Sequence, residues 1–179
     1  VDMPFLTYQV SPQRALLNCG RVMAEGGADG VKLEGASDSV LAAVRAVVDA
    51  GIPVMGHLGF TPQSVNTLGG ARVQARDAAG AKKIVDDAKR LEDAGAFSIV
   101  LELLPAKVAA RVTEAVRIPT IGIGAGAACS GQVLVLHDLL GLNDGVKPKF
   151  LKRYAAMAAE VREAISRFGD EVRAGSYPD

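Results

Sequence analysis

Helix-like and strand-like segments alternate along this chain with short connections, and this alternation restricts the folds it can adopt. Ser11-Pro12 is a helix start, Gly26-Gly27 ends that helix, and the apolar stretch GVKLEG follows. Further strand-like segments are expected near residues 1–6, 52–60, 97–105, 118–126 and 131–138, with intervening helices at about 37–50, 81–94 and 106–117. Nearly all-apolar strands indicate a parallel sheet covered by helices, hence an α/β barrel.

The overall composition limits the classes of function. The chain of 179 residues carries 20 Lys and Arg against 20 Asp and Glu and no Trp, so nothing favours a nucleic-acid or anionic-membrane partner. Cys19 and Cys129 lie too far apart for a metal motif and indicate free thiols in a reducing compartment. We expect a single cytoplasmic domain over residues 1–179, with no signal peptide or membrane span.

Polar residues interrupt the apolar strands near their carboxyl ends. Lys32 and Glu34 lie two residues apart and therefore share one side of a strand, while His57 and Glu102 hold similar positions on later strands. The carboxyl ends of barrel strands carry the active site. Carboxylates with a lysine and a histidine suit a hard cation such as Mg²⁺, an anionic substrate and proton transfer. Glycines 122, 124 and 126 leave room for a ligand or a close backbone approach.

Each of these residues also has a purely structural interpretation. Lys32 and Glu34 could form an ion pair without chemistry, His57 could be a hydrogen-bonded structural residue, and Glu102 could pair with a neighbouring cation. The glycine segment lacks the full spacing of a phosphate-binding fingerprint. The functional interpretation depends on the four polar positions falling at equivalent strand ends.

The last segment, 149–175, has the pattern of an amphipathic helix. Its apolar residues recur at intervals of four and three: Phe150, Tyr154, Met157, Val161, Ile165, Phe168 and Val172. The opposite face is mixed in charge, which favours packing on the barrel or on a neighbouring subunit over membrane binding.

Several stretches resemble the ketopantoate hydroxymethyltransferase (3-methyl-2-oxobutanoate hydroxymethyltransferase) family, almost from end to end. They are DMPFLTY (2–8), VKLEGA (31–36), GHLGFTPQSVNTLGGARVQAR (56–76), VLELLP (100–105), IPTIGIGAG (118–126) and DGVKPKF (144–150). The 56–76 block follows the longest family signature almost position for position. Ala36 and Ala75 each replace a glycine of the family pattern.

This resemblance implies a (β/α)₈ barrel enzyme that uses Mg²⁺. Such an enzyme transfers a hydroxymethyl group from 5,10-methylenetetrahydrofolate to 3-methyl-2-oxobutanoate and gives 2-dehydropantoate, in pantothenate biosynthesis. By the matching motifs, Asp2 would bind both Mg²⁺ and the oxo acid, and Glu34 would belong to the metal site. Lys32 and His57 would hold the oxo acid, and Glu102 would accept the proton. The folate-binding residues are not indicated, and a homo-oligomer, commonly a decamer, is implied.

The beginning of the chain departs from the family pattern. Family members carry two further strands before the first motif, including a G-D-S motif whose aspartate is the other direct Mg²⁺ ligand. We therefore expect an N-terminally truncated barrel with about six of eight β/α units, which a complementary N-terminal segment could complete. Two other hypotheses stay open: another Mg²⁺-dependent lyase or aldolase acting on a small 2-oxo acid, and a non-catalytic fragment or partner chain.

Overall fold

The computed structural model describes residues 1–143, 145 and 148–178. The chain divides into two compact units, Val1–Val133 and Leu134–Asp179, and each is described by itself. Whether both belong to one domain over residues 1–179 stays a prediction.

The first unit is built on a parallel sheet of five strands in the order β1-β2-β3-β4-β5. The strands are β1 (Val31–Glu34), β2 (Val54–Gly59), β3 (Ser98–Glu102), β4 (Thr120–Ile123) and β5 (Gly131–Gln132). Each strand pairs with the next one along the chain, as in a β/α barrel. The expected parallel α/β fold is therefore confirmed.

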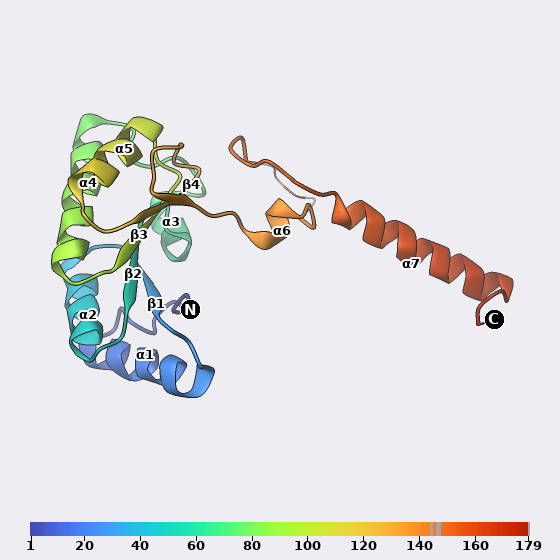
Figure 1. Ribbon diagram of the computed structural model, residues 1–179, viewed down its shortest axis with the longest axis horizontal. Coiled ribbons are helices and arrows are strands. Elements are labelled where there is room, and N and C mark those ends of the chain that lie inside the picture. The colour runs from blue at the N-terminus through green and yellow to red at the C-terminus, as the bar shows by residue number, and fades with distance from the viewer. Residues whose placement is uncertain (144, 146–147, 179) are drawn as a thin grey trace. The chain divides into compact units, whose positions relative to one another are not determined.

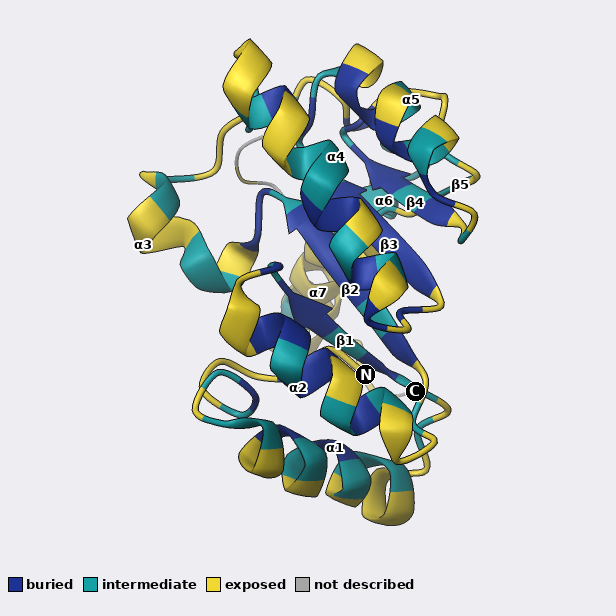
Figure 2. Cartoon of the chain, turned by 90° about the vertical axis from the view of Figure 1, so that its left-hand side faces the viewer, coloured by how far each residue is buried: buried dark blue, intermediate teal, exposed yellow. Residues whose placement is uncertain are grey.

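Helices cover one face of this sheet. They are α1 (Pro12–Gly26), α2 (Asp38–Asp49), α4 (Ala78–Asp93) and α5 (Ala106–Ala115) (Figure 1). Ser11, Ser37 and Asp77 cap the first turns of α1, α2 and α4 by accepting a hydrogen bond from a main-chain N–H. Figure 2 shows buried strands behind half-buried helices, which places the core between these two layers.

The strand register separates the two faces of the sheet. Leu33, Gly56 and Leu101 belong to the helix-covered face, where Leu33 and Leu101 are fully buried. A Cβ atom at Gly56 would lie 2.8 Å from the Leu91 side chain of α4, so glycine allows the helix to approach closely. The alternate residues, which include the predicted polar ones, all face the opposite side.

The sheet has five strands rather than the expected six. At the N-terminus, among the described residues, Asp2 forms only a single parallel bridge with Lys32. The predicted strand 131–138 pairs only over Gly131–Gln132. Beyond it the main-chain N–H groups of Asp138 and Leu139 bond to the carbonyl of Val135 and begin the short helix α6 (Leu136–Leu139).

The glycines at 122, 124 and 126 near β4 allow neighbouring parts of the chain to pack closely, and they do not line an open space for a ligand. Gly122 pairs with Leu101 on the helix-covered face, and a Cβ atom there would lie 2.9 Å from Cys129 Sγ. Gly124 and Gly126 have φ angles of 63° and 82° in the turn after β4. They are needed for packing and chain direction.

Between β2 and α4 lie two short helices, η1 (Pro62–Ser64) and α3 (Val65–Leu68). The helices predicted at 81–94 and 106–117 are confirmed with small shifts of their ends.

The second unit consists of α6 and α7 (Met157–Ala174). The predicted start of the last helix at residue 149 is wrong, because Tyr154 and Met157 donate main-chain hydrogen bonds to Leu139 and Leu140 instead of continuing a helix. Part of the DGVKPKF motif, residues 144, 146 and 147, lies outside the described residues. In the part of the chain that the structure describes, no helix has the length and apolarity needed to cross a membrane.

Candidate active site

Five predicted site residues come together at the carboxyl ends of β1, β2 and β3. We call them the site cluster: Asp2, Lys32, Glu34, His57 and Glu102. Glu34 pairs directly with His57 across β1 and β2, and Gly59 pairs with Glu102 across β2 and β3. The side chains at 34, 57 and 102 therefore project from the same face of the sheet.

Lys32 is the centre of one half of the cluster. Its Nζ lies 2.8 Å from Asp2 Oδ1, 3.2 Å from His57 Nδ1 and 3.9 Å from Glu34 Oε1. The bridge between Asp2 and Lys32 explains this arrangement, because Lys32 donates its N–H to the Val1 carbonyl and accepts from Met3 N–H. The Asp2 side chain is 53 % exposed, so this carboxylate remains open to solvent beside the ammonium group.

His57 links the two halves of the cluster. Its side chain is 3 % exposed, with Nδ1 3.6 Å from Glu34 Oε1 and Nε2 3.2 Å from Glu102 Oε2. Burial lowers the pKa of His57, but the carboxylates of Glu102 and Glu34 outweigh this effect and raise the pKa above its usual value. Despite the short distance to Glu102, Nε2 has no hydrogen bond of acceptable direction and remains a buried polar atom without a partner.

Glu34 is held as a carboxylate although it is buried. Burial raises its pKa, but His57, the main-chain N–H of Gln63 and the charge of Lys32 together lower it below the usual value. Gln63 N–H donates to Glu34 Oε2 over 3.0 Å. This geometry turns Oε1 toward Lys32 and His57.

Sequence reasoning did not single out two further residues at this site, Tyr8 and Gln63. The Tyr8 hydroxyl accepts a hydrogen bond from Glu34 N–H and donates one to Gln63 Oε1. Both residues lie inside motifs that the sequence displays, DMPFLTY and the 56–76 block. Their partners are 26 to 55 residues away along the chain, so no local pattern identifies the contacts.

The cluster contains two carboxylates of the kind that can bind magnesium. Asp2 and Glu34 present carboxylate oxygens on either side of Lys32, and Mg²⁺ often binds through one or two carboxylates while keeping waters. Over residues 1–143, 145 and 148–178, no group of three or more His, Cys, Asp and Glu side chains is arranged to hold a metal ion. Magnesium binding by Asp2 and Glu34 therefore stays a prediction.

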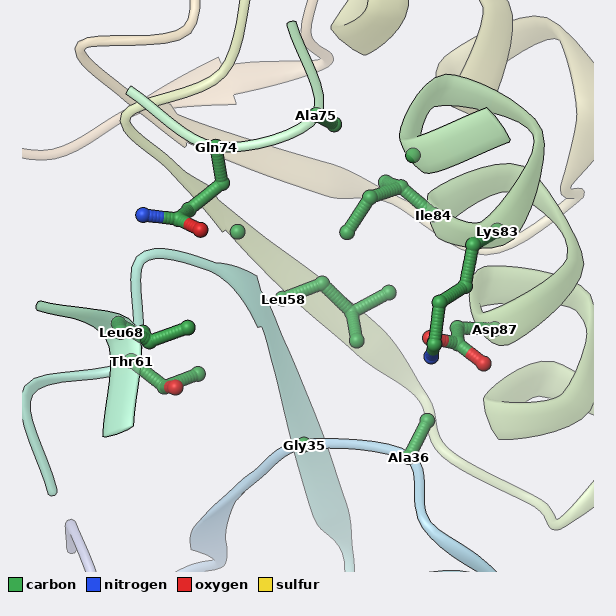
Figure 3. A pocket seen from close by; sticks show the side chains of 12 residues that line it. Gly35, Ala36, Leu58, Thr61, Leu68, Gln74, Ala75, Lys83, Ile84 and Asp87 are labelled. Carbon is green, nitrogen blue, oxygen red and sulfur yellow. The ribbon is translucent and has the colours of Figure 1, made fainter. Parts of the chain in front are cut away.

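A cavity of about 290 Å³ lies next to the cluster, between the ends of β1 and β2 and the start of α4 (Figure 3). Lys83 and Asp87 form an ion pair on one side of it, and Thr61 and Gln74 lie on the other. None of the site cluster lines this cavity. It is lined instead by residues of β2, of the segments after β1 and β2, and of α4, such as Leu58, Gly35 and Ile84.

Similar solved structures support the barrel-type fold. A 2,3-dimethylmalate lyase, described as a member of the PEP mutase/isocitrate lyase superfamily, superposes with a TM-score of 0.50 at 15 % identity, over 97 % of this chain and 58 % of that one. A putative phosphonomutase from Burkholderia cenocepacia gives a TM-score of 0.51 at 17 % identity, over 65 % of this chain and 51 % of the other. At these identities the likeness concerns the fold alone, and it agrees with an incomplete barrel.

Similar sequences carry more specific information. Three 3-methyl-2-oxobutanoate hydroxymethyltransferases match 99 % of this chain. They come from Clostridium beijerinckii, Moorella thermoacetica and Nitratidesulfovibrio vulgaris, and their sequences are 56 %, 57 % and 58 % identical to this chain, respectively. The chain spans 64 %, 66 % and 57 % of their respective lengths. The model of the ketopantoate hydroxymethyltransferase family matches residues 1–179. Together with the cluster of charged residues at the strand ends, this match shows that the chain belongs to the ketopantoate hydroxymethyltransferase family.

Proposed function

We propose that the chain takes part in hydroxymethyl transfer from 5,10-methylenetetrahydrofolate to 3-methyl-2-oxobutanoate. The observation that carries the proposal is the site cluster. In it, Lys32 lies between the carboxylates of Asp2 and Glu34. The buried His57 lies between Glu34 and a third carboxylate, that of Glu102. In the overall reaction, C3 of the oxo acid loses its proton and bonds to the folate methylene carbon. Water supplies the hydroxyl oxygen, and tetrahydrofolate leaves with protons on both nitrogens.

Lys32 and His57 would hold the oxo acid. The ammonium group of Lys32 provides a positive charge for the carboxylate or the developing enolate oxygen, a form of stabilisation that is strongest in a buried site. In the neutral ring of His57, Nδ1 accepts from Lys32, so the ring proton lies on Nε2. This buried N–H lacks a well-directed partner and is available to a substrate oxygen.

Glu102 would accept the C3 proton. It lies at the end of the apolar strand β3 with its side chain 19 % exposed, so a substrate can reach it while most of its surroundings exclude water. A carboxylate within hydrogen-bond reach of the reacting carbon is suited to general base catalysis.

Asp2 and Glu34 would hold Mg²⁺, with Asp2 also close to the oxo acid. A bound divalent cation would polarise the 2-oxo group and make the C3 proton more acidic. Asp2→Asn is therefore expected to raise the Mg²⁺ concentration needed for half-maximal activity.

The partners of this reaction are small molecules, and we propose a cytoplasmic homo-oligomer. The spacing of Val161, Ile165, Phe168 and Val172 along α7 supports self-association, since it gives the helix one apolar face.

The test is exchange of the C3 proton of 3-methyl-2-oxobutanoate in D₂O, followed by NMR with Mg²⁺. Enolisation requires no folate, so exchange above the metal-only control isolates the role of the cluster. Glu102→Gln should abolish the excess, whereas Glu114→Gln on the exposed side of α5 should not. Formation of 2-dehydropantoate on adding methylenetetrahydrofolate completes the assay.

Equal exchange by the wild type and Glu102→Gln would remove Glu102 from the mechanism. A wild-type chain that gives neither exchange nor 2-dehydropantoate, even with the complementary N-terminal segment added, would contradict the proposed function. Faster exchange of a different 2-oxo acid in a substrate panel would instead indicate another member of the lyase and aldolase group.

A further inference from the structure

A hydrogen-bond network lies behind the carboxylates of the site cluster. Tyr8 is 1 % exposed, and its hydroxyl accepts from Glu34 N–H at 3.1 Å while donating to Gln63 Oε1 at 3.0 Å. A buried hydroxyl with both partners in place is held in a single orientation. Tyr8 therefore fixes the main chain of β1 at the residue that carries the Glu34 carboxylate.

Gln63 connects three separate segments through this network. Its main-chain N–H donates to Glu34 Oε2 at 3.0 Å, and its side-chain Nε2 donates to the Met3 carbonyl at 2.8 Å. Gln9 Nε2 donates to Gln63 Oε1 at 3.1 Å. One glutamine thus contacts both the Glu34 carboxylate and the carbonyl group of Met3, the residue that follows Asp2.

From this geometry we infer that Tyr8 and Gln63 are positioning residues that hold Asp2 and Glu34 in one fixed arrangement for a divalent cation and the oxo acid. The inference rests on the proposed function, and it assigns a role to two residues that touch neither group.

The positions of the hydrogen bonds distinguish this role from general stabilisation of the fold. The main-chain N–H of Gln63 donates a hydrogen bond to Glu34 Oε2, so that Oε1 faces Lys32 and His57. On the other side, the bond to Met3 holds the segment whose Asp2 carboxylate is half-exposed. Gln63→Ala keeps the main-chain bond to Glu34 but removes the side-chain bond to Met3, which would let the Asp2 segment move relative to Glu34. Outer partners of this kind typically change metal affinity or activity by about 10- to 100-fold when they are removed.

The experiment compares Gln63→Ala and Tyr8→Phe with a matched control, Gln132→Ala. Gln132 also donates its side-chain amide to a main-chain carbonyl, that of Gly126 at 3.0 Å, but lies outside the site cluster. Tyr8→Phe keeps the buried ring and removes only the hydroxyl, so it tests the network if Gln63→Ala does not fold. Two quantities are measured: the Mg²⁺ concentration for half-maximal C3 exchange, and Mn²⁺ affinity by electron paramagnetic resonance without substrate.

For Gln63→Ala and Tyr8→Phe, the expected result is a rise of about tenfold in the half-activating Mg²⁺ concentration and a fall of about tenfold in Mn²⁺ affinity, with Gln132→Ala equal to the wild type. Half-activating Mg²⁺ and Mn²⁺ affinity within twofold of the wild type in folded variants would overturn the inference, even if their thermal stability fell. A wild type that shows no C3 exchange, even with the complementary N-terminal segment added, contradicts the proposed function alone, because Mn²⁺ affinity still tests the network. A wild type that also fails to bind Mn²⁺ overturns the inference.

Discussion

Two alanines, Ala75 and Ala36, replace glycines of the family motifs, and they differ in backbone conformation. The φ angle of Ala75 is 54°, in the left-handed region where a side chain costs about 1–2 kcal/mol, whereas Ala36 has no such angle. Ala75→Gly should therefore raise the free energy of unfolding by up to about 1 kcal/mol, after the greater entropy of glycine in the unfolded chain is included. Urea denaturation measures the change.

Ala36→Gly is the control for this substitution. Ala36 is buried outside the left-handed region, so the same loss of a methyl group should lower the free energy of unfolding by about 0.5–1 kcal/mol. Equal effects of the two changes would show that backbone strain at Ala75 is negligible.

Burial of Cys19 predicts a low reactivity of its thiol in the native chain. Cys19 on α1 is fully buried, and burial raises the pKa of its thiol to about 11. Iodoacetamide at pH 8–9 should thus leave Cys19 unmodified in the native chain and label it in urea, as followed by peptide mass spectrometry. Rapid native labelling of Cys19 would mean that α1 opens readily.

Folding raises the pKa of the Cys19 thiol, so the contribution of this thiol to the free energy of unfolding is fully present below pH 9 and is lost as the pH rises toward 11.

At the level of strands and helices, glycines at strand ends determine how closely the site-bearing strands approach. Gly59 ends β2 with a φ angle of 93°, and a Cβ atom there would overlap the Glu102 carbonyl oxygen. Gly59→Ala should lower the free energy of unfolding by more than about 4 kcal/mol or displace Glu102, since backbone strain and a main-chain clash act together. Thermal unfolding and C3 exchange would detect the two effects.

Gly35→Ala separates these contributions. Gly35 has a φ angle of 90°, but no atom lies within 4 Å of its added Cβ atom. Only strain applies, and we expect a loss of about 1–2 kcal/mol. A similar loss for Gly59→Ala would contradict the close approach of β2 and β3.

Elements with local signals could be predicted from the sequence, and those that depend on distant partners could not. Ser11 and Ser37 cap their helices as expected, because the capping hydrogen bond involves neighbouring residues. The alternation of Lys32 and Glu34 correctly placed both on one face of β1. By contrast, the end of β5 depends on pairing with Gly122, and apolarity alone suggested a longer strand. The network of Tyr8 and Gln63 joins residues 55 positions apart and leaves no periodic pattern.

On the scale of the whole molecule, the main feature of α7 is a continuous row of apolar side chains along one face. Val161, Ile165, Phe168 and Val172 recur on one face of this helix. A continuous apolar stripe of this kind marks an interaction surface, and the polar opposite face argues against a fully buried helix. We expect the stripe to support association between copies of the chain.

Ile165→Lys should therefore lower the mass of the chain in solution, measured by light scattering after size-exclusion chromatography. Glu163→Lys is the matched control: it also places a lysine on α7, on the face opposite the stripe, and should leave the mass unchanged. Lysine has a good helix propensity, so neither change is expected to unfold α7. A monomeric wild type, or an equal mass for Ile165→Lys and Glu163→Lys, would contradict association through the stripe, because only Ile165→Lys places a charge within the apolar face.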